Sequence, residues 1–241
     1  MPTFSDGDVH IYYEEYGEGF PILLFAPGGM RSALSYWAGS QWNPIKALAP
    51  YFRVIAMDQR NAGKSKAPVK GTDGWHSYTS DHIALLDHLE IDQCHVMGGC
   101  IGGPYCFGVM QKAPNRIASA ILQQTIGLDN NRQAFYEMFD GWAEQLKGKL
   151  TEVSEEDWAQ FRSNMYDGDF LFNVDRDFVE QCQIPMLVLM GSDLYHPEST
   201  SREIAALAPR VKFMEEWKDP EQDDTIKIAL DFLKENTPAM P

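Results

Sequence analysis

The chain has 241 residues, 44% hydrophobic and 23% charged, an ordinary composition for one globular domain. Its net charge of -15 argues against a nucleic-acid or anionic-membrane partner, because both bind through clusters of Lys and Arg. No apolar run approaches the roughly 20 residues of a membrane span, and residues 1–6 lack the basic and apolar parts of a signal peptide. Four cysteines without C-x-x-C spacing indicate a reducing compartment, so we expect a cytoplasmic protein without a metal site.

In chain order, apolar runs alternate with helical patterns. Runs of β-branched, aromatic and aliphatic residues predict strands at 9–16, 21–26, 53–57, 94–97, 118–123, 184–190 and 210–216. Helices are predicted at 42–48, 79–89, 104–111, 199–207 and 224–234. The helix over 79–89 is expected to begin with Thr79 or Ser80 as its N-cap. This order predicts an α/β fold, a mostly parallel sheet with helices on both faces.

The pattern changes between residues 128 and 177, where the chain is aromatic and acidic and shows no strand pattern. We interpret 128–177 as a helical insertion, and 1–127 with 178–241 as the core that it interrupts. Its aromatic and methionine content suggests an apolar face toward a substrate, with Trp142 as one candidate contact. The same aromatic residues could equally pack against one another.

A glycine-flanked turn lies between the strand at 94–97 and the helix that follows it. Gly98 and Gly102 bracket Cys100, and a reactive side chain on such a tight turn leaves no room for neighbouring Cβ atoms. The start of the helix favours negative charge and lowers a thiol pKa, so Cys100 is predicted to be a nucleophile. The alternative is a buried structural cysteine.

Together with this turn, three other segments resemble the α/β-hydrolase superfamily, with a cysteine in the nucleophile elbow as in dienelactone hydrolases. The four segments are 27–29, 58–65, 98–103 and 191–193. The resemblance covers essentially the whole chain and implies an α/β-hydrolase fold in which 128–177 is a lid. It also implies oxyanion donors at the backbone of Gly29 and Ile101, with Met30 as the near alternative, and Asp193 as the acid of a triad.

The chain departs from the family pattern at the base, since no histidine follows the last strand. His196, three residues after Asp193, is our first candidate for the general base. His76, expected in the loop before the helix at 79–89, is the second. The remaining histidines are expected to be structural, with His95 packed in a strand and the others on the surface: His10, His82 and His88.

Two arginines, Arg31 and Arg132, could pair with a substrate carboxylate, although each could also be structural. Arg60 is expected to be structural. We expect a small-molecule substrate and no cofactor, and the sequence leaves a homodimer open.

Three functions are consistent with these residues. The first is hydrolysis of an ester, lactone or thioester of a small, partly apolar or unsaturated acid through acyl-Cys100. The second is an isomerase or lyase that adds Cys100 reversibly to a conjugated acid, a reaction that needs no water. The third is non-catalytic binding of a small ligand.

Overall fold

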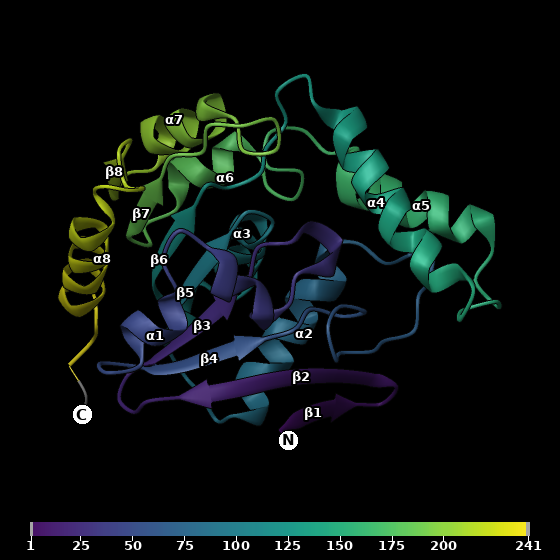
Figure 1. Cartoon of the computed structure of the whole chain (residues 1–241), viewed down its shortest axis with the longest axis horizontal. Coiled ribbons are helices and arrows are strands. Elements are labelled where there is room, and N and C mark those ends of the chain that lie inside the picture. Colours follow the sequence, from purple (N-terminus) through teal and green to yellow (C-terminus); the bar gives the residue numbers. More distant parts are fainter. Residues whose placement is uncertain (1, 240–241) are drawn as a thin grey trace.

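The computed structural model describes residues 2–239, and its centre is a twisted sheet in the order β1-β2-β4-β3-β5-β6-β7-β8 (Figure 1). β1 pairs antiparallel with β2 and β2 with β4, whereas every other neighbouring pair is parallel. The predicted α/β architecture is therefore confirmed. The strands are β1 (Thr3–Asp6), β2 (Val9–Tyr16), β3 (Pro21–Phe25), β4 (Arg53–Met57), β5 (Cys94–Gly99), β6 (Ile117–Gln123), β7 (Met186–Leu189) and β8 (Val211–Met214).

Helices connect the parallel strands and cover both faces of the sheet. The α-helices are α1 (Pro44–Leu48), α2 (Trp75–His88), α3 (Gly102–Lys112), α4 (Arg132–Lys147), α5 (Glu155–Tyr166), α6 (Arg176–Gln181), α7 (Glu198–Leu207) and α8 (Gln222–Glu235). Three short 3-10 turns are η1 (Gly29–Arg31), η2 (Leu34–Gly39) and η3 (Pro114–Arg116). No helix in the described part of the chain is long and apolar enough to cross a membrane.

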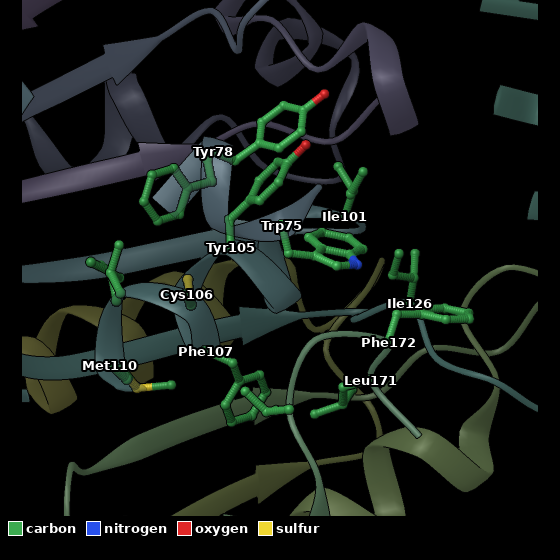
Figure 2. Close-up of a cluster of buried hydrophobic side chains, with 14 of the residues drawn as sticks. Trp75, Tyr78, Ile101, Tyr105, Cys106, Phe107, Met110, Ile126, Leu171 and Phe172 are labelled. Carbon is green, nitrogen blue, oxygen red and sulfur yellow. The ribbon is translucent and has the colours of Figure 1, made fainter. Parts of the chain in front are cut away.

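The sheet separates two hydrophobic cores, because successive side chains of a strand point to opposite faces. In β3, Leu23 and Phe25 join the core beneath α2 and α3, whereas Ile22 and Leu24 join the core beneath α1 and α8. Figure 2 shows Trp75 and Tyr105 among the side chains of the first core, together with Phe172 from the end of the insertion. The insertion is thus anchored to the sheet by the same core that supports α3.

The parallel strands bring their carboxyl ends to one edge of the sheet. Phe25 pairs with Gly98, Gly99 with Gln123, and Gln123 with Leu189. Ligand sites of open α/β sheets lie at this edge, where the following loops meet. The loops after β3, β5, β6 and β7 therefore converge here, although they are far apart in the sequence.

The helices of the insertion project from this edge (Figure 1). α4 and α5 lie against each other through aromatic contacts, including the rings of Phe139 and Phe161, 5.2 Å apart, and of Trp142 and Trp158, 5.9 Å apart. α4 also contacts η1, the turn after β3. The helical character predicted for this segment is confirmed.

Some local predictions are wrong. β1 is absent from the sequence prediction, and α2 begins at Trp75 rather than near Thr79, so Thr79 and Ser80 are not N-caps. The helix starts early because Ser77 Oγ accepts the Gly74 amide at 3.4 Å and donates to Asp73 at 2.8 Å.

The positions of two histidines also differ from those predicted. His76 is an exposed residue of this helix and does not lie in a loop. His82 is fully buried, with Nε2 2.7 Å from Gln59 Oε1, and burial lowers its pKa to about 3. His10 and His88 are exposed, as predicted, and His95 is packed between Ser119 and Thr237.

The loop after β4 is held by a nearly buried ion cluster. Arg60 pairs with Asp81 at 2.8 Å and with Asp73 at 3.1 Å, and the side-chain exposures are 9%, 7% and 12%. A buried charge that loses its partner is costly, whereas an exposed pair contributes little. The structural role predicted for Arg60 is confirmed.

We expect Arg60→Leu to lower the free energy of unfolding by about 3–5 kcal/mol, because it leaves two carboxylates unpaired in the interior. Urea denaturation followed by circular dichroism measures this loss. The matched control is Arg53→Ala, which breaks a half-exposed pair with Glu15 and should cost about 0–1 kcal/mol. Equal effects of the two substitutions would contradict the assignment.

Candidate active site

Cys100 occupies a strained turn between β5 and α3, with a φ of 59° that side-chain-bearing residues rarely adopt. The close packing around it explains the two flanking glycines. A Cβ at Gly98 would lie 2.0 Å from Gly102 O, and one at Gly102 would lie 2.3 Å from Phe25 O. The Cys100 amide donates to Gln123 O at 3.0 Å, which fixes the turn to β6.

Asp193 and His196 form a compact unit in the loop after β7. His196 Nδ1 lies 2.8 Å from the Asp193 carboxylate, and the same carboxylate accepts the backbone N–H groups of Tyr195 at 3.0 Å and His196 at 3.1 Å. The backbone closes the turn with Asp193 N–H on His196 O at 3.2 Å. The carboxylate thus fixes the orientation and the Nδ1 tautomer of the imidazole.

The other ring nitrogen of His196, Nε2, is buried and has no directed hydrogen bond within the described residues. His196 nevertheless lies close enough to Cys100 for each group to shift the pKa of the other. The two side chains share one cavity. Because Asp193 holds Nδ1, Nε2 is the ring nitrogen that can exchange a proton with a reacting group.

These surroundings favour a thiolate and an imidazolium. Burial raises the pKa of the Cys100 thiol, but His196 and the N–H groups of Gly28 and Ile101 outweigh it, so the pKa falls below its ordinary value. Burial also lowers the pKa of His196, but Cys100 and then Asp193 outweigh it and raise that pKa to about 9. Such a thiolate is the nucleophilic form of cysteine.

A cavity of about 260 Å³ opens above the thiol. Beside Cys100 and His196, its walls are glycine backbone and largely apolar side chains: Gly28, Gly29, Ile101, Ile126, Phe135, Met138 and Tyr195. A larger hollow of about 590 Å³ lies at the opposite edge of the sheet, around Gln93 and Pro185. Burial raises the pKa of Cys182, the cysteine that lines this larger hollow, and so favours its unreactive thiol form. We therefore place the candidate site at the smaller cavity, where the pKa of Cys100 is lowered.

The sequence-predicted residues divide into two groups. Cys100, Asp193 and His196 are brought together, and Gly29 and Ile101 line the cavity. The Gly28 amide, which the sequence prediction omitted, contacts the thiol.

The other predicted contacts lie outside the cavity lining. Arg31 donates to Gly141 O and Gln145 Oε1, and Arg132 donates to Tyr166 O and to Gly168 O. Trp142 is buried in the insertion, its indole N–H on Asn61 O at 3.2 Å, and His76 faces a different hollow. The Met30 amide donates to Met138 Sδ.

Sequence reasoning missed the apolar wall of the cavity, formed by Ile126, Phe135, Met138 and Tyr195. The available signal was the three-residue spacing of Phe135 and Met138, which places both on one side of a helix. The structure adds that this side of α4 faces Cys100. No group of three or more His, Cys, Asp or Glu within residues 2–239 is arranged to hold a metal ion.

Comparison with known proteins places this geometry in context. A family model described as alpha/beta hydrolase fold matches residues 21–182. An Azorhizobium caulinodans protein named "Putative carbamate hydrolase RutD" is 34% identical over 119 residues, 49% of this chain and 42% of that protein. The 2-hydroxy-6-oxononadienedioate/2-hydroxy-6-oxononatrienedioate hydrolase of Paraburkholderia xenovorans is 29% identical over 120 residues, 49% of this chain and 40% of that protein. The matched part spans less than half the length of these relatives.

Two solved structures share the fold over nearly the whole chain. The meta-cleavage product hydrolase CumD from Pseudomonas fluorescens IP01 has a TM-score of 0.73 and 20% identity, covering 98% of both chains. The enol-lactonase from Burkholderia xenovorans LB400 has a TM-score of 0.72 and 21% identity, covering 97% of this chain and 100% of that one. At these identities the likeness establishes the fold.

We expect Cys100 to react with iodoacetamide with a pH midpoint below the ordinary thiol value of about 8.5, because His196 stabilises the thiolate. The rate should fall as the pH drops through the Cys100 pKa, and His196 should lose its proton near pH 9. His196→Ala leaves burial unopposed by the imidazolium, so labelling at pH 7 should slow at least about tenfold. Intact-mass kinetics measure the profile.

The matched control is His88→Ala, which removes an exposed histidine of α2 and should leave the profile unchanged. A wild-type midpoint near 8.5, or one unaffected by His196→Ala, would contradict the ion pair and favour a ligand-binding protein.

Proposed function

The chain belongs to the alpha/beta hydrolase fold family, and on that premise we propose that it is a cysteine-dependent acyl hydrolase. The proposed substrates are esters, lactones or thioesters of small, partly apolar or unsaturated acids. The observation that carries the proposal is the coupling of Cys100 to His196, with the Asp193 carboxylate 2.8 Å behind the imidazole. A nucleophile, a base and an orienting acid are the parts that acyl transfer requires.

In the acylation step, the Cys100 thiolate attacks the carbonyl carbon and the carbonyl π electrons move to the oxygen. Backbone N–H groups of Ile101 and the Gly28–Gly29 turn would stabilise the resulting oxyanion. The oxyanion then re-forms the carbonyl, the bond to the leaving group breaks, and the His196 imidazolium gives its proton to that group. The product is acyl-Cys100 beside a neutral imidazole.

In the deacylation step, neutral His196 accepts a proton through Nε2 from a water that attacks the thioester carbonyl. The thiolate leaves, the acid product forms, and the imidazolium is restored. Asp193 holds the ring by Nδ1 and stabilises its positive charge. The position of His196 supports hydrolysis over an isomerase or lyase, because deacylation needs a base to activate water, whereas reversible addition to a conjugated acid needs no water.

The cavity supports a neutral, mainly apolar acyl group. Its volume of about 260 Å³ is below the range of about 300–1,000 Å³ for drug-sized ligands. Arg31 and Arg132 are bound to other parts of the protein, so neither is offered to a substrate carboxylate. The insertion, 128–177, would act as a lid, since Phe135 and Met138 of α4 cover the thiol.

The test is hydrolysis of p-nitrophenyl acetate and butyrate, with intact mass to detect the acyl adduct. Cys100→Ala should lower kcat at least about 10³-fold, because no nucleophile remains. His196→Ala should accumulate acyl-Cys100, since its deacylation lacks the base, while His88→Ala should match the wild type. No turnover and no adduct on Cys100 in the wild-type protein would overturn the proposal.

An isotope experiment separates the remaining alternative. Hydrolysis in ¹⁸O-labelled water should place one labelled oxygen in the acid product, because water attacks the acyl carbon. Turnover of an unsaturated acid without incorporation of labelled oxygen would instead indicate an isomerase or lyase.

A further inference from the structure

The thioether of Met138 lies on the turn that carries the predicted oxyanion donors. The Met30 amide donates to Met138 Sδ at 3.4 Å. A Cβ added to Gly29 would lie only 2.6 Å from the same sulfur, so that glycine allows the close approach. Met138 also lines the cavity above Cys100. The sulfur therefore covers a backbone donor at the edge of the candidate site.

Side-chain hydrogen bonds of Arg31 and Met30 tie this turn to the insertion. Arg31, the residue after Met30, donates to Gly141 O and to Gln145 Oε1 on α4. The Tyr166 hydroxyl of α5 donates to the Met30 side chain, at Sδ, at 3.4 Å. Since α4 and the turn are tied together, space in the cavity is most easily gained by rotation of the Met138 side chain.

Methionine suits such a role. Its side chain is unbranched, with three rotatable bonds, and its sulfur is only a weak hydrogen-bond acceptor. Because the hydrogen bond from the amide to the thioether is weak, little hydrogen-bond energy is lost when a substrate oxygen replaces the sulfur. Half-buried Met138 can therefore leave the Met30 amide at small cost.

We propose that Met138 is a specificity-determining residue, whose thioether covers the Met30 amide in the free protein and is displaced by the substrate. The incoming acyl compound takes the vacated space and an oxygen of it accepts the Met30 N–H. The site would thus select neutral, apolar acyl compounds that are narrow enough to enter beside Phe135 and Tyr195. The inference rests on the proposed function for its substrate class, but its labelling test does not need turnover.

Two variants test the displacement. Met138→Gln keeps an unbranched side chain but offers an amide oxygen, a stronger acceptor that is harder to remove. We expect KM for p-nitrophenyl butyrate to rise about threefold to tenfold with kcat nearly unchanged, as for loss of uniform binding. Met138→Ala removes the side chain that covers the Met30 amide, so KM for p-nitrophenyl butyrate should fall relative to KM for p-nitrophenyl acetate.

A second readout uses Cys100 alone. The rates of alkylation by iodoacetamide and by the bulkier, neutral N-benzyl iodoacetamide are compared at one pH. The ratio of the alkylation rate with the bulky reagent to the rate with the small reagent should fall at least threefold in Met138→Gln. It should rise at least threefold in Met138→Ala. Glu137→Ala, on the exposed side of α4, is the matched control and should leave the ratio unchanged.

Circular dichroism establishes that each variant is folded. If Met138→Gln matches the wild type in both KM and the labelling ratio, the sulfur only fills space and the inference is overturned. If no ester is hydrolysed but the ratios shift as expected, the proposed function fails while the role of Met138 stands.

Discussion

The electrostatic pairing of Cys100 and His196 is the interaction on which the site depends. Burial acts against both charges, raising the pKa of the thiol and lowering that of the imidazole. Each charged group offsets part of this burial cost for the other. Asp193 further stabilises the imidazolium, and the N–H groups of Gly28 and Ile101 further stabilise the thiolate. The tight turn at Cys100 makes this pairing possible, because a backbone φ of 59° holds the sulfur above the edge of the sheet. The parallel sheet serves it too, by bringing the loops after β5 and β7 together.

Much of the fold could be predicted because its signals are local. The buried strand β3 is a continuous apolar run, β4 and β6 are mostly apolar, and the elbow is marked by Gly98 and Gly102 within a strand-to-helix transition. β1 was missed because its four residues are mostly polar and exposed, and only pairing with β2 makes them a strand. The start of α2 depends on side-chain bonds among Asp73, Gly74 and Ser77, which composition does not reveal.

The candidate site was less predictable because it depends on contacts between distant segments. His82 was expected on the surface, but its burial depends on Gln59 and Phe25 from other elements. The sequence favoured His196 over His76 because of its place three residues after Asp193, but its position beside the thiol depends on how the loop after β7 folds against the turn after β5. The role of Met138 could not be read from its spacing on α4, since its partners, Gly29 and Met30, lie more than a hundred residues earlier.

The placement of Asp193 and His196 in one turn has a consequence for how the chain can vary. In the proposed mechanism every reacting side chain precedes α7, so β8 and α8 contribute no chemical group. The described contacts of this part of the chain are structural: α8 covers one core, and Trp217, between β8 and α8, donates to Met190 O at 2.8 Å. The last part of the fold is then constrained by packing and structural hydrogen bonds, and it can accept insertions or altered connections that a histidine-bearing loop could not. A change there alters how firmly the sheet is held and leaves the alignment of acid and base to a single four-residue turn.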